Sequence, residues 1–135
     1  MIVGLGMDLV RISRIQRLVQ RFPQRISGKI YTPDELASCR TRPDYCSCLA
    51  GRFAVKEAVL KTLGVGWAGG ARFADIEVLS GDNGRPLLQL RGKTADLARA
   101  QRIDEWHISI SHDHELAIAV AVAECSAGQS GGASL

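Results

Sequence analysis

The segment 49–63 constrains the fold most, because its residues are good helix formers throughout and a glycine follows at position 64. Its apolar side chains spread around nearly the whole circumference of a helix, which predicts a largely buried helix of about four turns. The segment nevertheless carries four charged side chains: Arg52, Lys56, Glu57 and Lys61. Because an isolated buried charge is very costly, these side chains need protein partners, a metal ion or a ligand.

The spacing of these charges leaves two interpretations open. Arg52 and Lys56 share one face of the helix and Glu57 and Lys61 share another, because residues four apart are neighbours. The charges can form ion pairs within the helix or contacts to other elements. Alternatively, they can belong to a ligand site.

Length and composition indicate a single domain. A chain of 135 residues with 46% hydrophobic and 23% charged residues can bury one core but not two. We assign residues 1–124 to this domain and residues 125–135, rich in glycine, serine and alanine, to a flexible tail. The formal charge of +3 does not demand nucleic acid. Because no apolar run has the length of a membrane span and no signal peptide is recognisable, we expect a cytoplasmic protein without a membrane partner.

The four cysteines match no familiar zinc-binding spacing. They are Cys39, Cys46, Cys48 and Cys125. A disulfide framework is not expected in a reducing compartment, so we expect free thiols.

The N-terminal part predicts a strand followed by a basic helix. Residues 2–8 read as a short buried strand that ends at Asp8, and its two glycines indicate close approach of a neighbouring backbone or a ligand. Residues 11–22 read as an amphipathic helix. One flank of this helix carries the basic side chains Arg14, Arg17 and Arg21. Such a stripe fits docking to an acidic partner, whether a protein helix, a phosphate or nucleic acid; a solvated basic surface is the alternative.

The remaining elements predict an α+β fold with mostly antiparallel strands. Thr32 and Glu35 form the pattern of a capping box, with Pro33 at the first helical position. Further along the chain we expect strands at 73–79 and 86–90 joined by a turn at 81–84, a helix from Thr94 to 101, and strands at 106–111 and 116–123, the last of them central.

Two carboxylates indicate a metal and phosphate site. Asp8 ends the first strand and Glu57 lies on the buried helix, and Mg²⁺ is commonly held by one or two carboxylates with substrate phosphates completing its shell. Lys61, one turn beyond Glu57, can meet phosphate oxygens next to the metal. Gly64 and Gly66 would let a diphosphate approach the backbone amides.

The histidines give a weaker signal. His107 and His112 are five residues apart on a predicted strand and therefore lie on opposite faces, which argues against a shared metal ion. His112, at a strand end, can bind a phosphate or act as an acid or base, although an ordinary structural histidine is the alternative.

Three motifs in register resemble one enzyme family. They are Gly4-Leu-Gly-Met-Asp8-Leu-Val10, Arg52-Phe-Ala-Val-Lys-Glu57-Ala-Val-Leu-Lys61-Thr-Leu-Gly64-Val-Gly66 and His107-Ile-Ser-Ile-Ser-His112. Together they resemble the holo-[acyl-carrier-protein] synthase family, the short 4′-phosphopantetheinyl transferases, over residues 1–124. The middle motif is the most specific of the three.

The resemblance implies a reaction and a set of site residues. Members of the family move the 4′-phosphopantetheine arm of coenzyme A to a serine hydroxyl of apo acyl carrier protein and release adenosine 3′,5′-bisphosphate. By motif match, Asp8 and Glu57 would bind Mg²⁺, Lys61 would pair with phosphate oxygens, and Gly64 would line the same turn. Arg52 and His112 would lie near the adenosine 3′-phosphate.

The resemblance also implies an architecture and a docking surface. It predicts a mostly antiparallel sheet wrapped around a long central helix, and a homotrimer with each active site in a cleft between subunits. The basic first helix, through Arg14, Arg17, Leu18 and Arg21, would dock the acidic helix of the carrier protein.

Two alternative functions belong to other classes. One is a non-enzymatic binding module whose arginine helix docks nucleic acid or an acidic protein; it leaves Asp8 and Glu57 unexplained, since carboxylates repel phosphates without a metal. The other is a trimeric nucleotide-binding protein without transfer activity, against which the presence of both carboxylates and Lys61 argues.

Overall fold

The computed structural model describes residues 1–65 and 70–126. Its α-helices are α1 (Ile12–Arg21), α2 (Pro23–Ile26), α3 (Pro33–Arg40), α4 (Tyr45–Leu63) and α5 (Gly92–Ala100). Its strands are β1 (Ile2–Arg11), β2 (Ile76–Ser80), β3 (Pro86–Leu90), β4 (Glu105–His112) and β5 (Leu116–Glu124). Of the predicted tail, only Cys125 and Ser126 are described. Among the described residues, no helix combines the length and apolar character needed to cross a membrane.

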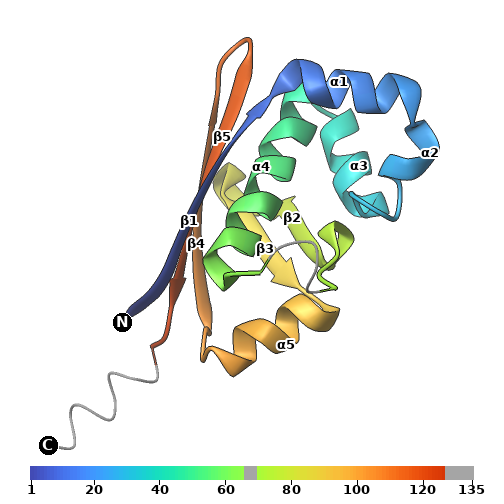
Figure 1. Ribbon diagram of the computed structural model, residues 1–135. Coiled ribbons are helices and arrows are strands. Elements are labelled where there is room, and N and C mark those ends of the chain that lie inside the picture. The colour runs from blue at the N-terminus through green and yellow to red at the C-terminus, as the bar shows by residue number, and fades with distance from the viewer. Residues whose placement is uncertain (66–69, 127–135) are drawn as a thin grey trace, which may run out of the picture.

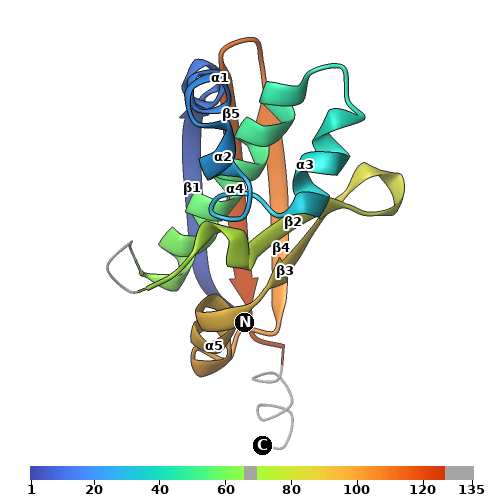
Figure 2. The same ribbon diagram turned by 90° about the vertical axis from the view of Figure 1, so that its right-hand side faces the viewer.

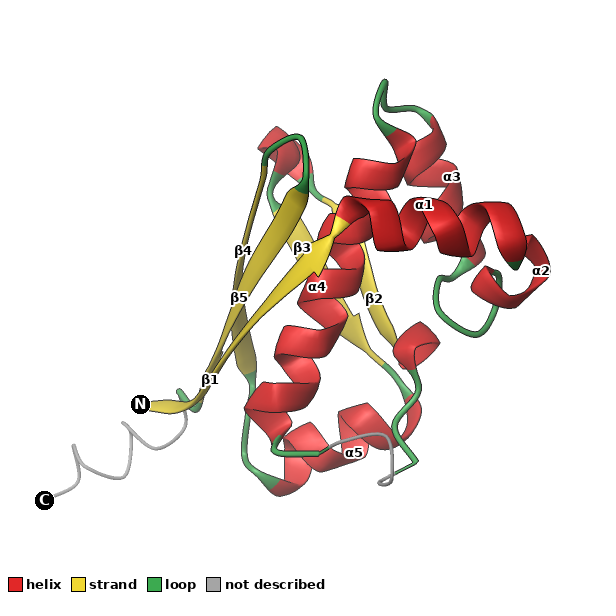
Figure 3. Cartoon of the chain, turned by 45° about the horizontal axis from the view of Figure 1, so that its top comes forward, coloured by secondary structure: helices red, strands yellow, loops and turns green. Residues whose placement is uncertain are grey.

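The strands form two antiparallel sheets, which confirms the predicted α+β class. One sheet has the order β1-β5-β4 and the other is the β2-β3 hairpin. Helix α4 lies between the two sheets, with α1, α2 and α3 gathered at one end and α5 at the other (Figures 1 and 3). Strand β5 is central, as predicted, so β1 and β4 are the two edges of the larger sheet.

Helix α4 is defined by clear signals at both ends. It begins at Tyr45, one turn earlier than predicted, because the Asp44 side chain accepts a hydrogen bond from the Ser47 backbone nitrogen at 3.3 Å. It ends where Gly64 adopts a φ of 73°, a left-handed conformation that glycine tolerates without strain. Most of its residues are buried, in agreement with the apolar circumference seen in the sequence.

The glycines of β1 allow the strand to pack directly against α4. A Cβ atom on Gly6 would lie 2.1 Å from the carbonyl oxygen of Ala58 and 2.4 Å from Oγ1 of Thr62. One on Gly4 would lie 2.7 Å from Cγ2 of Thr62. The predicted close approach of a neighbouring backbone is therefore confirmed, and the neighbour is α4.

Several predicted boundaries shift. Strand β1 continues past Asp8 to Arg11 because it stays paired with β5 to its end. Residues Phe73–Asp75 form a 3₁₀ helix, so β2 begins only at Ile76. Helix α5 begins before Thr94, whose hydroxyl donates to the carbonyl of Arg91 at 2.8 Å instead of capping the helix.

Lys56 and Glu35 form a fully buried ion pair. Both side chains have 0% exposure, and 2.7 Å separates Nζ of Lys56 from Oε1 of Glu35. The ammonium also donates to the carbonyl oxygens of Phe73 and Ile76, at 2.9 and 2.5 Å. Burial lowers the pKa of Lys56, and the Glu35 carboxylate opposes that shift. Lys56 therefore joins α4 to α3 and to the entry of β2.

Glu35 completes this network from α3. Its carboxylate accepts hydrogen bonds from the backbone nitrogens of Thr32 and Val78, each at 3.0 Å. The hydroxyl of Thr32 in turn accepts from the backbone nitrogen of Glu35 at 3.2 Å, so the predicted capping box is confirmed. One carboxylate thus caps its own helix, neutralises a buried lysine and anchors β2.

The expectation of four free thiols is wrong for two of them. Cys39 on α3 and Cys48 on α4 form a disulfide with a Cα–Cα distance of 5.6 Å. Cys46 and Cys125 are free. The compartment argument failed because it considered only the redox environment and not the packing that brings α3 onto the first turns of α4.

We expect Lys56→Met to lower the free energy of unfolding by about 3–5 kcal/mol, because it leaves the Glu35 carboxylate buried without its cation. Urea denaturation measures the change. Lys29→Met is the matched control, since Lys29 is exposed and should change stability by less than about 0.5 kcal/mol. Equal losses in the two variants would contradict the role assigned to the buried pair.

Candidate active site

Asp8, Glu57 and Lys61 meet between β1 and α4. Nζ of Lys61 lies 2.8 Å from Oδ1 of Asp8 and donates a second hydrogen bond to the carbonyl oxygen of Met7 at 3.1 Å. The Asp8 side chain is 12% exposed, whereas that of Lys61 is 56% exposed. The three predicted residues are therefore brought together, with Lys61 paired to Asp8 across two elements rather than to Glu57 within the helix.

Glu57 is half-buried and lies in the field of Asp8. Burial raises the pKa of Glu57 and the negative charge of Asp8 raises it further, while Arg14 and Lys61 oppose the shift. Hydrogen bonding and attraction to Asp8 raise the pKa of Lys61. Two carboxylates and an exposed ammonium group thus share one site, and the carboxylate oxygens are suited to a cation.

Gly64 lies three residues beyond Lys61 and ends α4. Its backbone nitrogen donates to the carbonyl oxygen of Lys61 at 3.1 Å, and a Cβ atom there would meet none of the described residues within 4 Å. Gly66, the second glycine expected near a diphosphate, lies outside the described residues.

A separate cavity of about 380 Å³ is lined by Arg52 and His112, the other two residues predicted to bind the ligand. It lies between the first half of α4, the β2-β3 hairpin and the end of β4. Arg42 and Ser80 also line it, and Nη2 of Arg42 donates to Oγ of Ser80 at 2.9 Å. Basic side chains therefore converge on this cavity from α4, β4 and the loop before α4.

Arg52 is buried and held by several acceptors. Its guanidinium donates to the carbonyl oxygen of Glu35 at 3.2 Å and to Oγ of Ser38 and Ser80 at 3.3 and 3.2 Å. It also contacts Sγ of Cys39 at 3.2 Å, so one end of the disulfide supports it. Burial lowers the pKa of Arg52. The guanidinium is thus fixed at the wall of the cavity.

The turn after His112 has a structural explanation. The Asp113 carboxylate accepts from the backbone nitrogens of Glu115 and Leu116, each at 2.8 Å, and closes the β4-β5 hairpin.

Hydrogen bonds from Ser47 lower the pKa of Asp44, and charge on His112 or His114 lowers it further. Asp44 and His112 both line the cavity, so its wall carries an acidic as well as basic groups.

The two groups of residues lie at opposite edges of the larger sheet. Strands β1 and β4 lie on either side of α4 (Figure 2). Asp8 and Lys61 meet where α4 packs on β1, and the cavity lined by Arg52 and His112 lies where α4 meets β4. The resemblance placed all of these residues around one ligand in a cleft between subunits, and within a single chain they form two separate groups. Sequence reasoning assigned no role to Arg42 or Ser80. For Arg42, the signal that it could line a site was its position just before the capped start of α4.

The basic stripe of α1 is exposed at Arg14, Arg17 and Arg21, and Leu18 between them is half-buried. Arg14 differs from the other two, because its guanidinium lies 5.3 Å from the ring centroid of Phe53 and its charge acts on Glu57. Arg17 and Arg21 therefore form the part of the stripe that is independent of the carboxylate site.

Comparison with known proteins shows which protein family the chain belongs to. Residues 4–121 match the family model of the 4′-phosphopantetheinyl transferase superfamily. Holo-[acyl-carrier-protein] synthase of Alkalilimnicola ehrlichii is 46% identical over 127 residues, covering 93% of this chain and 99% of the relative. That of Halothermothrix orenii is 42% identical over 124 residues, covering 92% and 98%.

Solved structures agree. The synthase of Neisseria meningitidis has a TM-score of 0.81 at 34% identity, covering 92% of this chain and 99% of that one. The Helicobacter pylori synthase in complex with coenzyme A has a TM-score of 0.77 at 35% identity, covering 89% and 99%. The chain belongs to the holo-[acyl-carrier-protein] synthase family, a family of transferase enzymes.

We expect Glu57→Gln to stabilise the metal-free protein at neutral pH. A carboxyl with a raised pKa favours the folded state below the ordinary pKa of glutamate, and that contribution is lost as the pH rises through the raised value. The variant avoids this loss, so its melting temperature should exceed that of the wild type at pH 7 and match it at acidic pH.

Thermal melts at several pH values in the presence of a chelator measure this difference. Glu115→Gln removes one exposed carboxylate elsewhere and serves as the control. A lower melting temperature of Glu57→Gln at pH 7 would mean that Arg14 and Lys61 outweigh burial and Asp8.

Proposed function

We propose that this protein transfers the 4′-phosphopantetheine group of coenzyme A to a serine hydroxyl of apo acyl carrier protein in a Mg²⁺-dependent reaction. The observation that carries the proposal is the meeting of Asp8, Glu57 and Lys61 between β1 and α4. Family membership supports it, because the relatives compared above are holo-[acyl-carrier-protein] synthases and the Helicobacter pylori structure is a complex with coenzyme A.

The residues at this site fit Mg²⁺. Asp8 and Glu57 supply hard oxygen ligands, and the negative charge of Asp8 raises the pKa of Glu57, which a cation between the two carboxylates would oppose. When bound, Mg²⁺ would neutralise charge on the diphosphate of coenzyme A and on the oxygens that develop charge during transfer. Asp8 and Glu57 would hold it.

Lys61 would bind the phosphate oxygens. Its ammonium group forms an ion pair with Asp8. The Lys61 side chain is 56% exposed, so it can turn toward a ligand when Asp8 binds metal. In the reaction, the serine oxygen bonds to the β-phosphorus and the bond from that phosphorus to the leaving 3′,5′-bisphosphate breaks. The serine proton passes to a base, for which Glu57 acting through a water molecule is our candidate.

The adenosine end of coenzyme A would occupy the cavity of Arg52, Arg42 and His112. Because this cavity and the carboxylate site lie at opposite edges of the sheet, we propose that one coenzyme A spans two copies of the chain. The β1 edge of one subunit would face the β4 edge of the next. A head-to-tail contact forms a ring when its rotation closes, and a homotrimer is our proposed assembly.

The outward face of β1 supports assembly. Leu5, Met7 and Leu9 point away from α4 and are 67%, 56% and 57% exposed. Alternate residues of the adjacent strand β5 continue this face as Ile118, Val120 and Val122. An exposed apolar surface of this kind is typical of a protein interface.

The carrier protein would dock on α1. Arg17 and Arg21 present positive charge, and the half-buried Leu18 gives the same surface an apolar contact. Arg14 would lie closest to the reacting groups, because it is the member of the stripe whose charge acts on Glu57. An acidic helix is the partner that this surface favours.

Incubation of apo acyl carrier protein with coenzyme A tests the function by mass spectrometry. The phosphopantetheine mass increment should appear only with Mg²⁺, and Asp8→Asn or Glu57→Gln should lower the rate by at least about a hundredfold, since the metal contributes several kcal/mol. Asp96→Asn, on the exposed face of α5, is the control. Full activity in either site variant would rule out the metal assignment.

Charge reversal on α1 tests the docking surface. Arg17→Glu and Arg21→Glu should each raise the KM for carrier protein about tenfold, because attraction to an acidic helix becomes repulsion. The KM for coenzyme A should not change. Lys93→Glu, exposed on α5, should leave both constants unchanged, and an unaltered KM for carrier protein in both α1 variants would remove this helix as the docking surface.

A further inference from the structure

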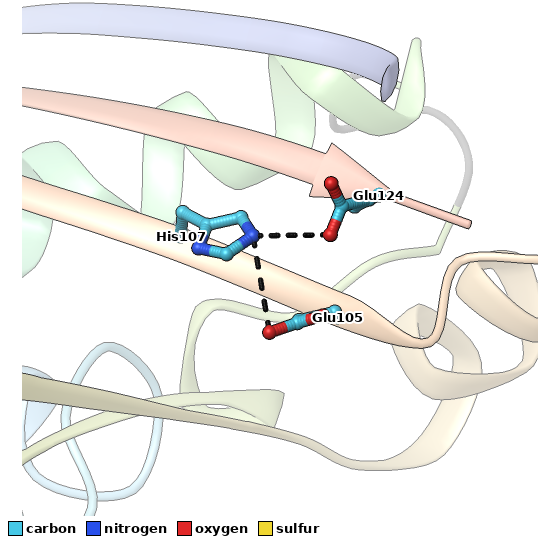
Figure 4. Close-up of side chains that lie close together, drawn as sticks. All are labelled: Glu105, His107 and Glu124. Atoms are coloured by element: carbon cyan, nitrogen blue, oxygen red, sulfur yellow. Dashed lines mark hydrogen bonds and ion pairs between the residues drawn. The ribbon is translucent and has the colours of Figure 1, made fainter. Parts of the chain in front are cut away.

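Three side chains with metal-binding atoms converge on the face of the larger sheet that points away from α4. They are Glu105 and His107 on β4 and Glu124 on β5 (Figure 4). Glu105 and His107 share this face because they are two residues apart on one strand, and Glu124 is the direct partner of Glu105 in the β4-β5 register. The cluster is separate from the cavity of His112, which lies on the other side of β4.

The distances suit a common ion. Nε2 of His107 lies 3.4 Å from Oε1 of Glu124 and 4.0 Å from Oε1 of Glu105. Donor atoms about 2.1 Å from a tetrahedral ion lie about 3.4 Å from one another. One of these pairs already has that separation, and the Glu105 side chain, 54% exposed, is free to close the remaining gap.

The charge of the cluster also calls for a cation. Two carboxylates directly opposite each other on paired strands destabilise a sheet. Among the described residues, no lysine or arginine forms an ion pair with Glu105 or Glu124, and their common partner is His107. One imidazole can compensate at most one of the two carboxylates, whereas a divalent ion neutralises both and uses the imidazole nitrogen as a third ligand.

We propose that Glu105, His107 and Glu124 bind a first-row transition-metal ion, with Zn²⁺ as the representative ion. Imidazole nitrogen is a ligand for zinc and its neighbours in the periodic table, whereas magnesium and calcium are bound through oxygen. Three protein ligands leave a further coordination position open. The site lies on rigid paired strands and is independent of the proposed transfer reaction.

Calorimetric titration of the chelator-treated full-length protein with Zn²⁺ tests the site, with excess Mg²⁺ present to occupy Asp8 and Glu57. We expect one Zn²⁺ per chain. His107→Gln and Glu124→Gln should each weaken binding by at least about tenfold, because even outer-shell partners of a metal site are worth that much. His114→Gln, on the exposed β4-β5 turn, is the matched control and should bind as the wild type does.

The competing results are distinct. Binding that is unchanged in His107→Gln and Glu124→Gln, or lost in Cys46→Ser, would overturn the site, the latter in favour of a thiol ligand. Absence of zinc binding to the wild type would mean that the cluster is an ion pair only. Because the titration contains neither coenzyme A nor carrier protein, failure of the transfer reaction leaves its outcome unaffected.

Discussion

The ion pair between Lys56 and Glu35 is the interaction on which the rest of the structure depends. It is fully buried, and through it α4, α3 and the beginning of β2 are fixed to one another. Such a pair adds little net stability compared with apolar side chains, but it tolerates only one arrangement of the elements that meet there. Arg52, one turn earlier on the same face, depends on that arrangement, because its acceptors lie on α3 and at the end of β2.

The charged residues of α4 have different roles because the helical period places them on two faces. Arg52 and Lys56 point toward α3 and β2, whereas Glu57 and Lys61 point toward β1 and α1. The first pair is committed to the fold, although Arg52 also forms a cavity wall. In the second pair Glu57 has a raised pKa and Lys61 a side chain that is mostly in solvent, and these are properties that a site for a metal ion and phosphate requires.

Local sequence patterns predicted the ends of several elements and which strand is central. They did not predict which residues far apart in the sequence contact one another. The capping box at Thr32, the glycine end of α4 and the central position of β5 follow from residues close in sequence, and they are confirmed. The partner of Lys56 lies 21 residues away, and the disulfide partner of Cys48 is set by how α3 packs on α4. Spacing separated the face of Arg52 and Lys56 from that of Glu57 and Lys61, but it could not show which strands and helices each face meets.

The close contact between α4 and the sheet has a consequence for the opposite face. Gly4 and Gly6 on β1, and alternate alanines along β5, keep the inner face flat enough for the helix backbone to approach. The bulky residues of both strands are therefore on the outer face, where no described element covers them. The part of the sheet formed by β1 and β5 is therefore apolar on both faces, and such a surface is normally covered. Packing α4 on one face thus leaves the apolar part of the other face uncovered, and in the proposed assembly a second copy of the chain would cover it while bringing a β4 edge to a β1 edge.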